Sequence, residues 1–230
     1  SDTWRNSNFY YGWGYISIAI SKKINKRVKR KLEQSLNQIS CFILAAGLSK
    51  RMGLENKLLK KYNNNIIINQ TLKSHYESKL KKIILIVGHD KEAILESTKD
   101  FKIPILDNNN YQDGMLSSIL KIKDNIDKET TGIMISLGDM PLVTSEDINS
   151  LIKNFIANSG KKICIPSFNN KLGNPMLIPV DTFKRLTIKT NNLLKDKGLK
   201  GAILEDGYDI VKVKASRGVL KDFDKAEDFN

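Results

Sequence analysis

From residue 40 onward the chain alternates between short apolar runs and longer segments in which apolar residues recur every three or four positions. The short runs are rich in β-branched residues, which predicts strands. Strands are expected at Cys41–Ala45, Ile83–Val87, Ile103–Leu106, Gly132–Leu137, Ile163–Pro166 and Ile210–Lys214. Helices are expected at Ile68–Ser78, Lys91–Thr98, Met115–Asn125, Ser145–Asn158 and Asp181–Leu186. Strands that alternate with helices are typical of parallel sheets with right-handed crossovers, so the pattern predicts one doubly wound α/β domain.

The first forty residues follow a different pattern, and we expect a boundary near Ile39–Ser40. An aromatic segment is followed by a basic stretch whose apolar residues recur at four-residue spacing: Ile24, Val28, Leu32 and Leu36. This spacing predicts a basic amphipathic helix over Lys22–Gln38. We therefore divide the chain into an N-terminal extension of unassigned role, 1–40, and a domain that covers 41–230.

The formal net charge of +13 comes from both parts, with +6 in residues 1–40 and +7 in the remainder. A basic run can bind nucleic acid or an anionic membrane surface, but it is more often a solvated helix face. A positive field would also favour an anionic substrate. We do not expect nucleic-acid binding to be the main function.

The longest mostly apolar run, Phe9–Ile20, is too short to span a bilayer, and it precedes the basic cluster instead of following it as in a signal peptide. We expect a cytoplasmic protein without a membrane span. The two cysteines, Cys41 and Cys164, fall in predicted strands and are expected to be core residues. The chain begins with Ser1 instead of Met, which indicates a fragment or a processed form.

Ligands of doubly wound domains bind beyond the carboxyl ends of the strands, so the loops that follow strands carry the candidate chemistry. The first such loop reads LAAGLSKRMG, from Leu44 to Gly53, and Lys57 follows it. Its small residues let backbone N–H groups approach phosphate oxygens. Arg51 can bind two oxygens at once, and Lys57 adds a point charge. The loop predicts binding of a nucleoside triphosphate; the alternative is a basic turn after a strand.

Two groups of carboxylates follow later strands. Asp139 comes after the apolar run GIMISLG and before Pro141, where a strand must end, so it suits a magnesium ligand or else a turn. Asp222 and Asp224 would share one face if they lie in a strand, and Asp224 could then share the metal with Asp139. The alternatives are a solvated aspartate or a cap for a helix that starts at Lys225.

Two further loops are polar. Asn108–Gly114 leads into a helix whose first turn carries Ser117 and Ser118, and these groups could bind an anion or a nucleobase edge. Gly173–Pro175 forms a tight turn, which alone predicts only a turn. Gly198 likewise indicates a turn near the start of a helix.

Taken in order, the motifs LAAGLSKRMG with Lys57, NNNYQDGMLSS, LGDMP, GNPMLIP, GLKGAIL and DFDKAEDF resemble the molybdenum cofactor nucleotidyltransferase family over about four-fifths of the chain. The resemblance implies a Rossmann-like three-layer α/β/α fold with a mostly parallel sheet. It also implies a bound Mg²⁺, with Mn²⁺ as a substitute, and attack by a substrate phosphate on the α-phosphate of a nucleoside triphosphate. The sequence LAAG resembles the cytidylyltransferase branch, which transfers CMP from CTP to molybdopterin and releases pyrophosphate. The product of that branch serves molybdenum hydroxylases, which makes such a hydroxylase or its maturation chaperone the implied protein partner.

The same resemblance assigns roles by motif position. The catalytic residues would be Arg51, Lys57 and Asp139. The metal ligands would be Asp139 and Asp224. The nucleotide would contact Leu44, Ala45, Ala46, Gly47, Ser49, Arg51, Lys57, Asn108, Gly114, Ser118 and Asp139. The pterin substrate would contact Gly173, Asn174 and Pro175.

This sequence departs from the family pattern at two motifs. It has GNP where the family often has GHP, and DFDKAEDF where the usual pattern is DIDTPED. Three alternatives therefore stay open. Two keep the fold and change the substrates: GTP with molybdopterin, or CTP with a sugar or polyol phosphate. The third is a non-catalytic module that binds nucleic acid or a protein partner through Lys22–Lys31.

Overall fold

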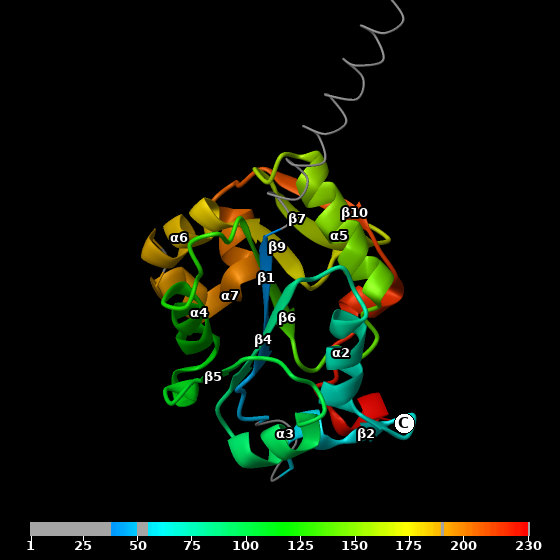
Figure 1. Ribbon diagram of the computed structural model, residues 1–230. Helices are drawn as coiled ribbons and strands as arrows, with labels where there is room; N and C mark the ends of the chain where they lie inside the picture. Colours follow the sequence, from blue (N-terminus) through cyan, green and yellow to red (C-terminus); the bar gives the residue numbers. More distant parts are fainter. Residues whose placement is uncertain (1–37, 50–54, 190, 230) are drawn as a thin grey trace, which may run out of the picture.

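The computed structural model describes residues 38–49, 55–189 and 191–229. The predicted helix over Lys22–Gln38 falls almost wholly outside these ranges. A mixed eight-stranded sheet forms the centre of the domain (Figure 1). Its strands are β1 (Ile39–Ala45), β4 (Lys82–Val87), β5 (Ile105–Asp107), β6 (Gly132–Leu137), β7 (Ile163–Phe168), β8 (Lys171–Leu172), β9 (Met176–Pro179) and β10 (Ile210–Lys214). Strands β2 (Lys61–Tyr62) and β3 (Asn65–Ile66) form a separate two-stranded sheet.

The main path through the sheet has the order β10-β7-β9-β6-β1-β4-β5, and β8 pairs with β7 at one side. Strands β6, β1, β4 and β5 are parallel neighbours, as the alternating pattern predicts. In the parallel register Leu44 of β1 faces Ile86 of β4 and Leu137 of β6. The carboxyl ends of these central strands therefore lie at one edge of the sheet, which is where the predicted loops begin.

Helices cover both faces of this sheet, which confirms the three-layer α/β/α prediction. The helices are α2 (Ile67–Tyr76), α3 (Lys91–Thr98), α4 (Met115–Lys123), α5 (Ser145–Ala157), α6 (Val180–Lys189) and α7 (Asn191–Glu205). In Figure 1, α2 and α5 lie on one side of the sheet and α4, α6 and α7 on the other. Helix α5 begins at a cap, because the Thr144 side chain accepts a hydrogen bond from Asp147 N–H.

Strand β1 shows how the sequence builds two cores. Its alternate residues Cys41 and Ile43 pack with α2 and α5 residues, whereas Phe42, between them, packs with residues of α4, α6 and α7. All three are fully buried, so the strand reads as a continuous apolar run. Burial also raises the pKa of the Cys41 thiol, and it raises that of Cys164 to about 12. Both cysteines are free and buried, as expected for core residues.

Strands β8 and β9 and helix α7 are among the elements that the sequence pattern did not predict. Asn169 and Asn170 adopt positive φ and turn β7 back into β8, after which β9 runs antiparallel between β6 and β7. The sequence pattern predicts only the tight turn Gly173–Pro175 in this region. Helix α7 was not predicted as a separate element, although Gly198, with φ of 65°, does interrupt it as the glycine pattern indicated.

The segment 219–224 is not a strand, which corrects that option. Residues 219 and 220 belong to a short 3₁₀ helix, η4 (Arg217–Leu220), and 221–224 lie between it and another, η5 (Ala226–Phe229). Phe223 is buried against Tyr62, with ring centroids 4.7 Å apart, so hydrophobic anchoring replaces strand pairing there. In the described ranges, no helix combines the length and apolar character that crossing a membrane requires.

Candidate active site

The loops that follow β1, β5 and β6 meet the C-terminal segment around a pocket of about 510 Å³. It lies at the carboxyl-end edge of the sheet, so residues far apart in sequence become neighbours. The residues that line it are Leu44, Ala46, Gly47, Leu48, Ser49, Lys57, Leu58, Tyr111, Gln112, Gly114, Met115, Ser118, Leu137, Asp139, Asp222 and Asp224. The structure thus brings together most residues that the motifs singled out. Arg51 lies outside the described residues.

The loop after β1 is braced by its own side chains. Ser49 has a positive φ of 48°, and its hydroxyl accepts a hydrogen bond from Lys57 N–H at 3.3 Å. The Asn56 side chain caps the 3₁₀ helix η2 (Lys57–Leu59) by accepting from Leu58 N–H at 3.0 Å. These contacts fix Lys57 at the start of η2 with its side chain directed into the pocket. Ala45, by contrast, ends β1 opposite Val87, and its side chain belongs to the core.

Asp139 is held by a close approach between two strand ends. A Cβ atom on Gly138 would lie 2.9 Å from the Leu44 carbonyl oxygen, so only glycine fits there without displacement. Gly138 N–H donates to that carbonyl at 2.9 Å, which extends the β1–β6 ladder by one contact. On the other side, Phe223 N–H donates to the Asp139 carbonyl at 3.0 Å. The backbone of Asp139 therefore joins the sheet to the C-terminal segment.

Lys57 bridges two of three clustered carboxylates. One oxygen from each of Asp139, Asp222 and Asp224 lies within 4.8 Å of the others. The Lys57 ammonium is 2.5 Å from Asp139 Oδ2 and also contacts Asp224 Oδ1. Burial lowers the pKa of Lys57, but the two carboxylates raise it by more, so its net pKa lies above the ordinary value. Burial raises the pKa of Asp139, and the Lys57 ammonium opposes this shift. The raised pKa of Lys57 therefore follows from its two carboxylate partners, whereas the raised pKa of Asp139 follows mainly from burial.

The donor set fits a divalent cation. Three carboxylates cluster around one ammonium, which directly contacts two of them, and hard cations prefer carboxylate oxygens. Asp139 is 9 % exposed, and its Oδ1 atom is buried without a hydrogen-bond partner among the described residues. A buried, unpartnered carboxylate oxygen is costly unless a cation or donor completes it. Asp139 and Asp224 were predicted as metal ligands, and the structure adds Asp222 to the cluster.

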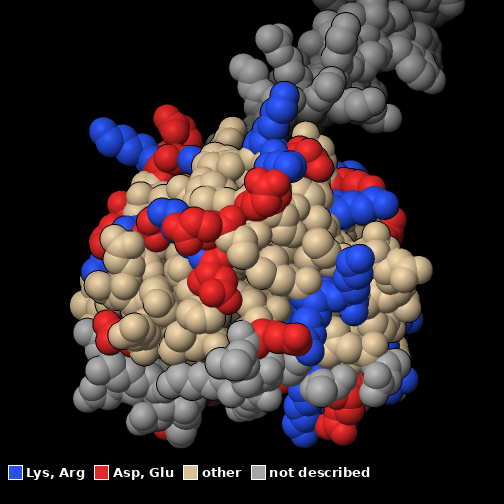
Figure 2. Space-filling view, turned by 90° about the horizontal axis from the view of Figure 1, so that it is seen from below, with Lys and Arg blue, Asp and Glu red and all other residues tan. Residues whose placement is uncertain are grey.

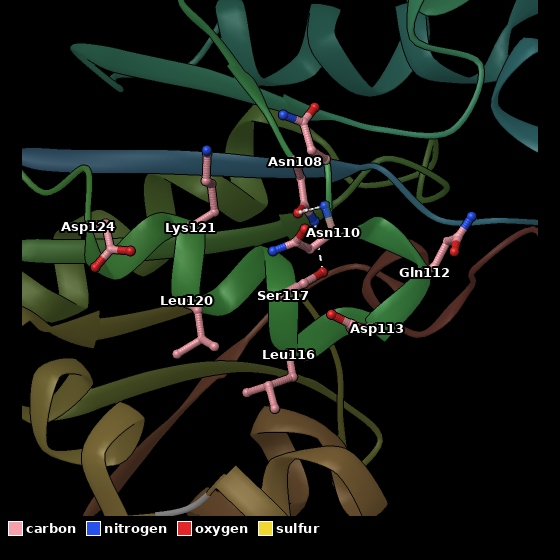
Figure 3. Close-up of a pocket in the computed structure, with 10 residues that line it drawn as sticks. Asn108, Asn110, Gln112, Asp113, Leu116, Ser117, Leu120, Lys121 and Asp124 are labelled. Carbon is pink, nitrogen blue, oxygen red and sulfur yellow. Dashed lines mark hydrogen bonds between the residues drawn. The ribbon is translucent and has the colours of Figure 1, made fainter.

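Asn108 has a different place from the one predicted. Its side-chain amide donates to Ser117 Oγ at 2.8 Å, and its Oδ1 accepts from Asn110 N–H (Figure 3). The same amide also donates to Ser118 Oγ at 3.1 Å. The residue is 3 % exposed and fastens the β5–α4 loop to the first turn of α4. It lines a second cavity, of about 900 Å³, instead of the 510 Å³ pocket. Gly114 and Ser118 do line the 510 Å³ pocket.

The turn Gly173–Pro175 packs against the C-terminal segment. Asn174 N–H donates to the Val219 carbonyl at 2.9 Å, and a Cβ atom on Gly173 would lie 2.1 Å from the same oxygen. Gly173 and Pro175 are buried, Asn174 is half-buried, and none of them lines the 510 Å³ pocket. Gly173 N–H also donates to the Pro166 carbonyl at 2.8 Å, so this turn connects β7 to η4.

Sequence reasoning missed two side chains near the site. Tyr111 lines the pocket from the 3₁₀ helix η3 (Tyr111–Asp113) and packs over Gly88, where a Cβ would be 2.7 Å from the tyrosine Cβ. Lys200 of α7 donates to the Leu172 carbonyl at 3.2 Å; burial lowers its pKa, whereas the charge of Asp222 raises it. The motif GLKGAIL included this lysine, but no spacing rule directed it toward the carboxylates.

The surface around the site is not uniformly basic. Figure 2 views the molecule from below Figure 1, on the side toward which β1 runs. On the described part of this face, acidic and basic side chains are interspersed with large uncharged areas. The charge of +13 therefore does not gather into a continuous basic surface on this part of the molecule.

Comparisons with known proteins agree with this geometry. Residues 41–209 match the model of a family described as the MobA-like NTP transferase domain. Molybdenum cofactor cytidylyltransferase from Escherichia coli K12 is 25% identical over 195 residues, which cover 84% of this chain and 95% of that protein.

Solved structures share the fold, as two examples show. The Rv0371c homologue from Mycobacterium sp. strain JC1 has a TM-score of 0.71 at 24% identity and covers 84% of this chain and 93% of its own. Rv0371C from Mycobacterium tuberculosis H37Rv, in complex with manganese, has a TM-score of 0.68 at 20% identity and covers 83% and 95%. The family match over most of the chain, joined to a lysine and carboxylate pocket at the carboxyl ends of the strands, establishes that this nucleotidyltransferase belongs to the MobA-like NTP transferase family.

Proposed function

We propose that this enzyme transfers CMP from CTP to the terminal phosphate of molybdopterin, which yields molybdopterin cytosine dinucleotide and pyrophosphate. The similarity to the E. coli cytidylyltransferase, which extends over 95% of that protein, supports this substrate pair. The loop LAAG, with Ala46 and Gly47 at the pocket wall, is the local feature that favours the cytidylyl branch. A cytoplasmic location is proposed on the same basis.

One observation carries the proposal. The ammonium of Lys57 and the carboxylates of Asp139, Asp222 and Asp224 converge beside the glycine-bearing loop after β1. A triphosphate with a divalent cation has the charge pattern that such a site complements. Asp139, Asp222 and Asp224 would hold Mg²⁺ or Mn²⁺. When bound, the ion supplies charge neutralisation for the triphosphate and the leaving pyrophosphate.

The reaction requires no side-chain nucleophile. An oxygen of the acceptor phosphate forms a bond to the α-phosphorus of the nucleotide. The bond from that phosphorus to the bridging oxygen breaks, and pyrophosphate leaves with the electron pair. The chain contributes alignment and charge: Gly47 and Ser49 border the phosphates, and Lys57 exchanges its carboxylate contacts for phosphate oxygens.

Lys200 marks the side of the site that we assign to the acceptor. It donates to the carbonyl of Leu172, the residue before the turn Gly173–Pro175, and it interacts electrostatically with Asp222. A half-buried ammonium beside the metal-binding carboxylates suits an anionic acceptor. We place the acceptor phosphate between Lys200 and the nucleotide, with the pterin toward Asn174.

The decisive experiment measures pyrophosphate release from the purified chain with Mg²⁺ and molybdopterin, and compares CTP with GTP at equal concentrations. The proposal expects turnover with CTP at least ten times faster than with GTP. The same assay with a sugar or polyol phosphate in place of molybdopterin tests the acceptor. Preference for GTP, or turnover only with a polyol phosphate, would replace the substrate assignment while keeping the transferase chemistry.

A variant separates true turnover from a contaminant. Asp139→Asn keeps the shape of the side chain and removes its charge, so pyrophosphate release should fall to background while the circular dichroism spectrum stays unchanged. Residual release equal to wild type would show that the activity does not arise from this pocket.

A further inference from the structure

We propose that Asp147 is a positioning residue that aligns the metal-binding carboxylates by fastening the C-terminal segment to the loop after Asp139. This inference rests on the proposed function only in its use of a divalent cation; it does not depend on which nucleotide or acceptor the enzyme uses. Asp147 lies in the first turn of α5, outside the lining of the 510 Å³ pocket.

The Asp147 carboxylate accepts more hydrogen bonds than a helix cap needs. Its Oδ2 atom accepts from Thr144 N–H at 3.1 Å and from the Thr144 hydroxyl at 3.0 Å, which completes the capping box. Ser216 approaches from the other side: its N–H donates to Oδ1 at 2.7 Å and its hydroxyl to Oδ2 at 2.7 Å. Asp147 is only 4 % exposed. Short, charge-assisted contacts to a buried carboxylate are the strong kind, so this contact ties two segments firmly.

The two segments are those that carry the metal ligands. Thr144 ends the loop that leaves Asp139, and Ser216 begins the turn that leads through η4 to Asp222 and Asp224. The Ser216 hydroxyl also accepts from Gly218 N–H at 3.2 Å and so caps η4. Asp147 therefore joins the loop that follows Asp139 to the segment that carries Asp222 and Asp224.

The segment from 216 to 225 needs such a link because no strand or α-helix orders it. Glycine packing, single hydrogen bonds and the buried side chains of Val219 and Phe223 hold it instead. A Cβ on Gly218 would lie 1.9 Å from the Leu142 carbonyl oxygen, and Val219 accepts from Asn174 N–H. Where individual contacts replace a ladder, loss of one contact displaces the ligands downstream, and residues behind metal ligands commonly change affinity 10- to 100-fold.

Two matched variants test the role of Asp147. Thr144→Ala and Ser216→Ala each remove one hydroxyl that donates to the same Oδ2 atom, at 3.0 Å and 2.7 Å. Mn²⁺ is titrated into each purified protein by isothermal calorimetry, and thermal midpoints are recorded in parallel. Ser216→Ala should raise the Kd for Mn²⁺ by about tenfold. Thr144→Ala should lower the thermal midpoint through loss of the cap and change the Kd less than twofold.

Two further variants sharpen the test. Asp147→Asn removes the charge and should weaken Mn²⁺ binding at least as much as Ser216→Ala. Ser216→Thr keeps the hydroxyl and should restore the wild-type Kd. Equal Kd values for Ser216→Ala and Thr144→Ala, or an unchanged Kd in Asp147→Asn, would overturn the positioning role.

Failure of the proposed function gives a different result. Wild-type protein that binds Mn²⁺ but prefers GTP removes the CTP assignment and leaves the Asp147 comparison intact. Wild-type protein that binds no Mn²⁺ overturns both.

Discussion

Asp139 and Asp224 contact the same lysine, yet the chain holds these two carboxylates by different means. Asp139 follows β6, which is paired with β1 on one side and β9 on the other. Asp224 lies in a segment without strand pairing, where its N–H donates to the Asp228 carboxylate at 2.9 Å. The sheet gives the first carboxylate a place set by many cooperative contacts, whereas the second depends on a few local ones.

Because of this difference, we expect metal affinity and stability of the fold to respond differently to substitutions on the two sides of the site. A ligand fixed by a ladder keeps its position when a single neighbour changes, because the strand on either side still defines it. A ligand fixed by point contacts can be displaced without unfolding the domain. We therefore expect substitutions in the C-terminal segment to alter metal affinity before stability, and substitutions at the sheet edge to alter both.

The largest effect is expected at the sheet-held carboxylate. Asp139→Asn should reduce kcat/KM for pyrophosphate release by at least about 10²–10³-fold, because the buried ligand loses its charge. The matching change on the other side, Asp222→Asn, should cost less, since Asp222 is exposed. Steady-state kinetics over a range of Mg²⁺ concentrations measure both. A larger loss in Asp222→Asn than in Asp139→Asn would reverse the proposed order of the two sides.

Lys57 contacts both the sheet-held Asp139 and Asp224 of the C-terminal segment. We expect its removal to cause the second largest loss of activity. Lys57→Ala leaves the carboxylates without their ammonium, and loss of a buried charge partner costs about 2–5 kcal/mol in transition-state stabilisation. Lys99→Ala is the control, because Lys99 makes an exposed ion pair with Glu96 that contributes little. Both are compared by kcat/KM for CTP. Wild-type kinetics in Lys57→Ala would remove this lysine from the site.

The same contrast explains what the sequence could predict. The strand over Gly132–Leu137 was predicted with its observed bounds, because a buried parallel strand is a continuous apolar run, and Pro141 marks its end. The position of Asp139 could then be predicted, because ligands bind at the carboxyl ends of parallel strands. The position of Asp222 could not be predicted in this way, because it depends on Ser216 and Gly218, and no periodicity encodes contacts between distant loops.

The antiparallel β9 escaped prediction for a related reason. The turn that reverses the chain uses two asparagines, Asn169 and Asn170, at positive φ, which is a weaker signal than an Asn-Gly pair. Asn108 was predicted to contact the nucleotide, but its side-chain amide donates hydrogen bonds to Ser117 and Ser118. Sequence patterns identify polar residues near a site, whereas the structure decides whether their hydrogen bonds are already satisfied.

A pH experiment separates the stability of the α/β body from the chemistry of the pocket. His75 of α2 is fully buried, and burial lowers its pKa from 6.5 to about 4, although its hydrogen bond to the Thr71 carbonyl opposes the shift. The unfolded chain therefore binds this proton first as the pH falls. The contribution of His75 to the free energy of unfolding is therefore fully present above pH 6.5. It is lost progressively as the pH falls to about 4, and the total loss is on the order of 3 kcal/mol.

His75→Leu should flatten the dependence of the free energy of unfolding on pH between 6.5 and 4, as measured by urea titration. His89→Gln is the control, since His89 is half-exposed in the turn after β4 and is the only other histidine. The slope should persist in His89→Gln. A slope that survives in His75→Leu as well would assign the acid sensitivity to another group.

The smallest effect is expected from paired glycine substitutions, which compare the two regions directly. Gly218→Ala places a Cβ 1.9 Å from the Leu142 carbonyl in the C-terminal segment, and Gly138→Ala places one 2.9 Å from the Leu44 carbonyl at the sheet edge. Overpacking of this kind costs about 1–3 kcal/mol. In Gly138→Ala the ladder transmits the strain, so the free energy of unfolding should fall by that amount. In Gly218→Ala the segment shifts instead, so the Kd for Mn²⁺ should rise while the unfolding free energy changes less. Equal losses of stability, with equal Kd values, would show that the C-terminal segment is held as rigidly as the sheet.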